Sequence, residues 1–208
     1  MFDDDLVQDL VDQATPYQRA LAATLCLNRA SALAEDERAD AAGVPGLRRL
    51  IDDSKGFCRA RALGSAASVG AAPFEAEALG VRFREILGPD DAPYDEPDGL
   101  AAWFVDVLSI ADYVVRTWNE PEESGSRCFD VLVAGYSLAG ILEDDPEPPS
   151  PQPFGDLEAA RQLADLRAVA GVPEPIGSDD LDALIAESAV LREGYVSRFQ
   201  EVSPPPAP

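Results

Sequence analysis

Apolar residues recur every three to four positions along most of the chain, which is the spacing of an amphipathic α-helix. The clearest case begins at Leu100, where an apolar stripe continues to Trp118 and predicts a helix of about six turns. After a short polar break, a second stripe from Phe129 to Ala139 predicts another helix. Because the break is short, the two helices are expected to form an antiparallel hairpin.

The first half of the chain predicts three more helices. A helix after Thr15-Pro16 is apolar on most faces and is expected to lie at the centre of the core. A second is expected to begin at Leu47, with an interruption at Gly56. Residues 64–73 are small and rich in helix breakers, so they predict a flexible connection to a short helix that ends at Gly88-Pro89.

The second half of the chain predicts a helix that begins near Asp156 and a last one that begins at Ser178, where a serine and two acids suit a helix start. No stretch alternates apolar and polar residues in the way that a half-buried strand requires. We therefore expect an all-α bundle of about six to eight helices, folded as one domain over residues 1–202. Residues 144–153 predict an acidic, proline-rich loop, and residues 203–208 a flexible proline-rich tail.

The chain is strongly acidic, with 39 Asp and Glu against 16 Lys and Arg and a formal charge of -23. Such a surface repels nucleic acid and anionic membranes, so neither is expected as a partner, whereas a basic protein is. Solubility alone is the alternative role for this charge. The acids concentrate in two segments, which we predict to form the partner surface: Asp90, Asp91, Asp95, Glu96 and Asp98, then Glu143, Asp144, Asp145 and Glu147.

Catalytic chemistry has little support in the residues, because the chain has no histidine, the usual proton carrier near neutral pH. Residues 135–140 resemble a nucleophile elbow around Ser137, but alanine stands at the second glycine position and the segment has helical spacing. The small residues of this segment instead predict a surface where another helix crosses closely. Asp106 and Asp112 are predicted to face solvent rather than to act as a catalytic pair.

Zinc binding is not expected, because histidine is absent and the three cysteines lie 32 and 70 residues apart. Cys26, Cys58 and Cys128 have apolar neighbours and are predicted to be reduced thiols in the core of a cytoplasmic protein. The amino terminus lacks the basic and apolar pattern of an export signal, and no run is long enough to span a membrane. A hard cation held by the two acidic segments stays open as an alternative, but no cofactor is expected.

Two short segments resemble a known family. Residues 17–22 with 26–29, and later residues 158–162 with 165–166, resemble the first and last helical signatures of the bacterial domain-of-unknown-function 416 family. The resemblance covers roughly residues 15–170 and implies an all-helical fold without an established activity. Two departures are the missing tryptophan near residues 55–57 and the inserted proline-rich segment at 144–153.

These observations favour a binding role over an enzymatic one. The leading hypothesis is an acidic protein-binding module, for example an immunity protein or an inhibitor that covers the basic site of a toxin. The alternative hypothesis is an enzyme that uses a divalent metal or carboxylates to act on a small molecule between the helices.

Overall fold

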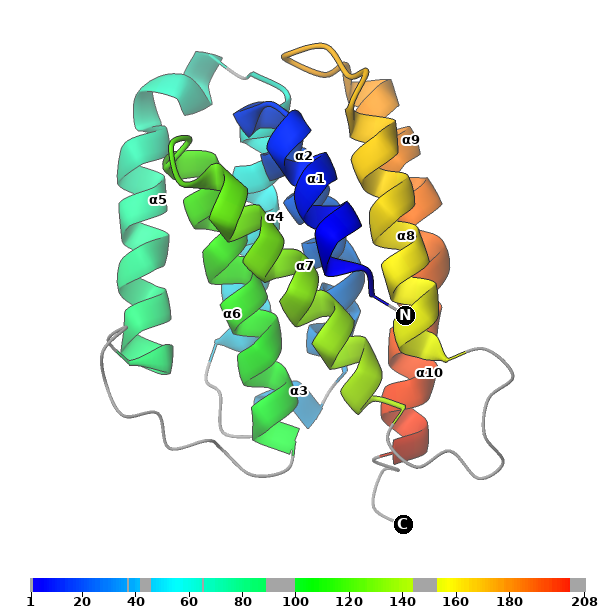
Figure 1. The fold of residues 1–208 in the computed structure, drawn as a ribbon. Helices are drawn as coiled ribbons and strands as arrows, with labels where there is room; N and C mark the ends of the chain where they lie inside the picture. The colour runs from blue at the N-terminus through cyan, green and yellow to red at the C-terminus, as the bar shows by residue number, and fades with distance from the viewer. Residues whose placement is uncertain are drawn as a thin grey trace.

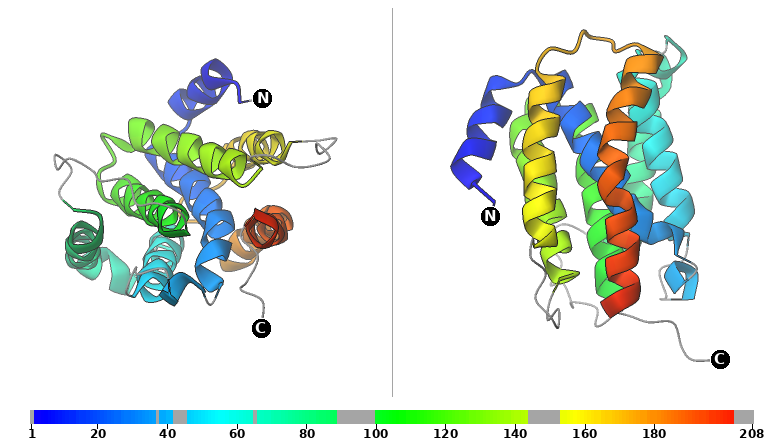
Figure 2. Two further views of the ribbon diagram at one scale, coloured as in Figure 1. Left: turned by 90° about the horizontal axis from the view of Figure 1, so that it is seen from below. Right: turned by 90° about the vertical axis from the view of Figure 1, so that its right-hand side faces the viewer.

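The computed structural model describes residues 2–36, 38–41, 46–64, 66–88, 100–143 and 153–202. Within these ranges every regular element is helical, and the long helices run up and down beside one another (Figures 1 and 2). The predicted all-α fold is therefore confirmed. The α-helices are α1 (Asp4–Gln13), α2 (Pro16–Ala30), α3 (Arg38–Ala41), α4 (Leu47–Ala62), α5 (Ala66–Leu87), α6 (Leu100–Asn119), α7 (Ser124–Ile141), α8 (Phe154–Val169), α9 (Ser178–Ser188) and α10 (Arg192–Val202).

Helix α2 lies in the middle of the bundle, as its apolar faces predict (Figure 2). It begins with a reciprocal cap, in which the Thr15 hydroxyl accepts the Gln18 N–H at 3.2 Å and the Gln18 side chain accepts the Thr15 N–H at 2.9 Å. Pro16 occupies its first turn, where no amide donor is needed. One turn of 3-10 helix, Ser31–Glu35, follows it.

The predicted hairpin is confirmed, because α6 and α7 run antiparallel and in contact (Figure 1). The small residues of α7 also have the predicted effect. A Cβ atom on Gly135 would lie 2.5 Å from the Cys26 sulfur, so glycine lets α7 approach α2 closely. Within the described ranges, no helix is long and apolar enough to cross a membrane.

A charged cluster inside the core joins α2 to α8 and α9. The Arg29 guanidinium is fully buried and donates to Glu158 Oε1 at 2.6 Å, to Asp165 Oδ2 at 2.5 Å and to the Ser188 hydroxyl at 2.6 Å. Arg161 pairs with the other Asp165 oxygen at 2.7 Å. Burial lowers the pKa of Arg29, but the two carboxylates outweigh this effect and raise it well above its ordinary value. The guanidinium is therefore charged, and its charge is neutralised inside the core.

The structure corrects the predictions for α4 and α5. Gly56 does not interrupt α4, which is one continuous helix. Residues 66–73, predicted to be a flexible connection, belong to α5. Alanine is the strongest helix former, and its abundance in this segment outweighs the breakers. Figure 1 shows α5 bent in its first half, which contains Pro73, a residue without the N–H that continues the helix. The predicted end is confirmed, since α5 stops at Leu87 and Gly88 has a φ of 83°.

The last predicted helix is divided in two. A 3-10 turn, Ala189–Leu191, separates α9 from α10. Ser178 does not cap α9, because Gly177 is the N-cap residue and makes no side-chain cap bond. The Ser178 hydroxyl instead accepts a hydrogen bond from Arg59 at 3.4 Å.

Asp112 is buried, so the prediction that it faces solvent is wrong. Its side chain pairs with Arg116, one turn later on α6, at 2.8 Å. This pairing supplies the neutralisation that a buried carboxylate needs. Trp118 lies in the core as predicted, and its indole N–H donates to the Thr24 hydroxyl at 2.9 Å. The proline-rich loop at 144–153, apart from Pro153, and the tail at 203–208 lie outside the described residues.

Replacing Arg29 with methionine is expected to lower the free energy of unfolding by about 3–5 kcal/mol, because Glu158 would stay buried without a cation and Asp165 would keep only Arg161. Urea unfolding at pH 7 measures this change. The control is Arg49→Met, since the Arg49 side chain is 84% exposed and lies 4.0 Å from Asp53. That change should alter stability by less than about 0.5 kcal/mol. Equal effects from both substitutions would show that the buried cluster does not hold the helices together.

The three cysteines are free and buried, as predicted, and burial raises the pKa of Cys58 and of Cys128 to about 12. Since the thiolate is the reactive form, none of the three should react with a thiol reagent at pH 8 in the folded protein. All three should react once guanidinium unfolds the chain. Absorbance with a disulfide reagent counts the reacted thiols, and prompt reaction of the folded protein would contradict the burial.

Candidate functional site

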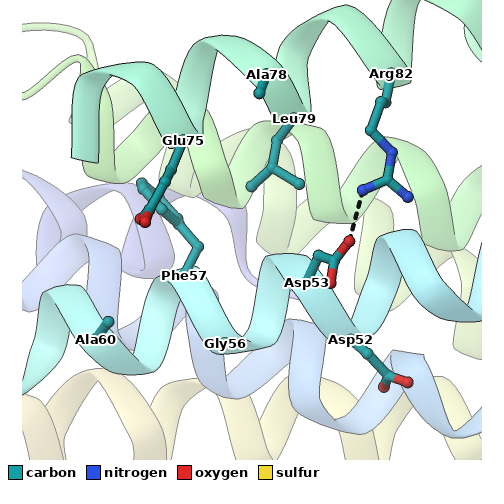
Figure 3. Close-up of a pocket in the computed structure, with 9 residues that line it drawn as sticks. All are labelled: Asp52, Asp53, Gly56, Phe57, Ala60, Glu75, Ala78, Leu79 and Arg82. Atoms are coloured by element: carbon teal, nitrogen blue, oxygen red, sulfur yellow. Dashed lines mark hydrogen bonds and ion pairs between the residues drawn. The ribbon is translucent and has the colours of Figure 1, made fainter. Parts of the chain in front are cut away.

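A groove lies between α4 and α5, and we call it the α4–α5 groove (Figure 3). Its volume is about 470 Å³, within the range of sites that hold a ligand or a large side chain. Its lining residues are Asp52, Asp53, Gly56, Phe57 and Ala60 of α4, and Glu75, Ala78, Leu79 and Arg82 of α5.

Small residues make this groove. Gly56 and Ala60 are one turn apart and therefore share a face of α4, while Ala78 lies on α5. None of these three side chains fills the space between the two helices. Beneath them, Phe57 and Leu79 are buried and form an apolar floor. The groove is thus shallow, apolar at its base and open to solvent.

Charged groups stand at the rim of the groove. In Figure 3, the Asp53–Arg82 ion pair, at 2.6 Å, lies toward one end and Glu75 lies near Phe57 toward the other. Asp53 also lies 4.0 Å from Arg49. By contrast, Asp52 and Glu75 are exposed, and each makes no hydrogen bond or ion pair with the part of the chain that the structure describes. Three of the lining residues are acidic and one is basic, so the groove has a net negative charge, although in Figure 3 the Asp52 carboxylate is directed away from α5.

Such a groove suits a long cationic side chain. An arginine or lysine packs its methylene stem on an apolar surface and keeps its charged head at a polar edge. The planar guanidinium of arginine also forms two parallel hydrogen bonds with a carboxylate. Arginine therefore fits the floor and the rim together.

The predicted partner surface is only partly described. Glu143 lies at the end of α7, and its carboxylate accepts the Phe154 N–H at 2.5 Å. Phe154 is the first residue of α8, and the first amides of a helix have no partner within the helix. Glu143 therefore caps α8, while a role in binding a partner stays a prediction. The other predicted residues lie outside the described ranges: Asp90, Asp91, Asp95, Glu96, Asp98, Asp144, Asp145 and Glu147.

Sequence reasoning missed the α4–α5 groove because its two sides lie on different helices, and the way these helices pack against each other cannot be inferred from local spacing. A partial signal was present. Gly56 and Ala60 form a small-residue face one turn beyond Asp52 and Asp53, within a segment of helical spacing. The sequence alone did not indicate that this face of α4 packs opposite Glu75 and Ala78 of α5.

Ser137, which the elbow-like motif had singled out, is an exposed residue inside α7. The strand-to-helix turn that a nucleophile elbow needs is therefore not present at this position. Among the described residues, no three His, Cys, Asp or Glu side chains are placed to hold a metal ion. The open hypothesis of a hard cation gains no support from these ranges.

Comparisons with protein-family models, with curated proteins and with solved structures find no match to this chain. The resemblance to the domain-of-unknown-function 416 family consequently stays a prediction.

Proposed function

We propose that this protein is a binding protein for a basic protein partner, and that the α4–α5 groove receives an arginine side chain of that partner. The observation that carries the proposal is the combination of an apolar floor with the Glu75 carboxylate at the rim and the nearby Asp52 carboxylate, neither of which has an ion-pair partner among the described residues.

The charge distribution supports a basic partner. At least ten of the fifteen arginines pair with carboxylates of the same chain, among them Arg38 with Asp36 and Arg127 with Glu123. Most of the positive charge is therefore neutralised locally, and the excess of acidic residues determines the field around the molecule. Complementary charge of this kind speeds association with a basic protein and disfavours acidic competitors.

Inhibition of a basic toxin, as by an immunity protein, is one form of this proposal. An inhibitor of that kind covers a positively charged active site, and an arginine from that site would enter the groove. For the predicted acidic segments at 90–98 and 143–147, a role in binding the partner stays a separate prediction, and only Glu143 of them lies in the described ranges. The alternative of a metal- or carboxylate-dependent enzyme has no specific observation in its favour.

The double substitution Asp52→Asn with Glu75→Gln tests the groove. It keeps the shape of both side chains and removes both charges, so an arginine partner should bind at least about tenfold more weakly, as expected for the loss of charged hydrogen bonds. Affinity capture from the source cells at low salt, with quantitative mass spectrometry, should recover a basic protein with the unsubstituted chain. Isothermal titration with that protein then gives the two dissociation constants.

The matched control is Asp9→Asn with Glu77→Gln, which removes two exposed carboxylates outside the groove. It should retain the partner with less than about threefold loss, because Asp9 lies on α1 and Glu77, two residues from Glu75 on α5, does not face the groove. Recovery of no basic protein would refute the proposed partner. Equal losses in both double variants would place the contact elsewhere than in the groove.

A further inference from the structure

A second hollow lies between α4, α2 and α9, and we call it the Lys55 pocket. Figure 2 shows α4 between α5 on one side and the α9–α10 segment on the other, so this pocket and the α4–α5 groove flank the same helix. Its volume is about 300 Å³, the size of a small-molecule site. Its lining includes Thr24 and Asn28 of α2, Lys55 and Arg59 of α4, and Leu181 and Ile185 of α9.

The polar groups of this pocket differ in whether they are already bonded. The Thr24 hydroxyl is engaged, because it donates to the Ala20 carbonyl at 2.7 Å and accepts from Trp118 at 2.9 Å. The Asn28 amide and the Lys55 ammonium make no side-chain hydrogen bond or ion pair within the described part of the chain. Two hydrogen-bond donors are thus left for a ligand.

The other cations around the pocket are neutralised by the protein itself. Arg59 pairs with Asp182 at 2.7 Å, and Arg192 pairs with Glu35. Arg192 also donates to the Asn28 carbonyl at 2.7 Å, which places its guanidinium beside the α2 side of the pocket. Lys55, the one lysine of the chain, is the cation that has no such pairing in the described ranges.

The surroundings of Lys55 make its positive charge unfavourable. Burial lowers the pKa of this ammonium and the charge of Arg192 lowers it further, while Glu35 and Asp52 oppose the change. An anion placed beside the ammonium would compensate for the lost hydration. A chain with 39 acidic residues thus contains a half-buried site that favours a negative ligand.

The remaining walls are apolar, since Leu181 is buried and Ile185 extends the same face of α9 one turn later. A bare inorganic anion would leave these walls without a contact. An organic acid would cover them with its hydrocarbon part and would direct its carboxylate to the two donors.

We propose that the Lys55 pocket binds a small organic monocarboxylate. The carboxylate accepts hydrogen bonds from Lys55 and Asn28, and a short apolar body packs on Leu181 and Ile185.

Isothermal titration and thermal melting with isovalerate and benzoate test this proposal. The neutral amides isovaleramide and benzamide are matched controls of nearly equal shape. Both carboxylates should bind to one site and should raise Tm with concentration, as linkage requires. Each amide should bind at least about tenfold more weakly, because it cannot form the charged contact. Equal effects of acid and amide, or saturable binding by neither acid, would overturn the proposal.

Variants locate the site. Lys55→Met should abolish the rise in Tm on adding carboxylate, yet it should raise the Tm of the free protein, because the half-buried charge is gone. That second result distinguishes a lost site from a misfolded chain. Arg49→Met removes one positive charge from an exposed position of α4 and should bind both acids normally. Unchanged binding by Lys55→Met would refute the site, and an equal rise in Tm with inorganic phosphate would refute the ligand class.

Discussion

The fully buried Arg29 guanidinium is the strongest constraint on how the helices pack, because its charge must be neutralised inside the core. A buried charge is tolerated only where opposite charges and hydrogen bonds surround it, and here these come from α8 and α9. The hydrogen bonds reach Glu158, Asp165 and Ser188 at once, so the two helices have one favourable placement against α2. That placement also positions α9 as a wall of the Lys55 pocket. The short segments behind the family resemblance, at 26–29, 158–162 and 165–166, contain Arg29, Glu158, Arg161 and Asp165 of this cluster.

The proposed function depends on which charged side chains the protein neutralises internally and which it leaves without an ion pair. Most arginines pair within the chain, which leaves the surface acidic and the α4–α5 groove with two carboxylates without an ion pair in the described ranges. On the opposite side of α4 the balance is reversed, because the cation that has no internal pairing there is Lys55. Gly56 lines both hollows, so one small residue leaves room on each side of the helix. The proposed large basic partner and the proposed small acidic ligand would therefore not compete for one site.

The helical spacing of apolar residues correctly predicted several helices, above all α2, α6 and α7. It did not predict the arrangements that only packing creates, since Arg29 and Glu158 are 129 residues apart, and Asp52 and Glu75 line one groove from two different helices. Asp112 was wrongly predicted to face solvent, because its ion pair with Arg116, one turn later on α6, allows the carboxylate to be buried. Helix α1 was not predicted, although Asp3 caps it by accepting the Leu6 N–H at 3.0 Å. The α4–α5 groove and the Arg29 cluster were both missed because each is formed by residues of different helices that only the packing brings together.

The two proposals together make α4 the helix that separates two binding sites of opposite charge preference. Amide chemical-shift mapping of one isotope-labelled sample, titrated in turn with L-arginine amide and with isovalerate, tests it most directly. We expect two separate sets of shifted amides, one around Glu75 and Ala78 on α5 and the other around Asn28 on α2 and Ile185 on α9. Shifts of one common set of amides by both probes, or of neither set, would contradict it.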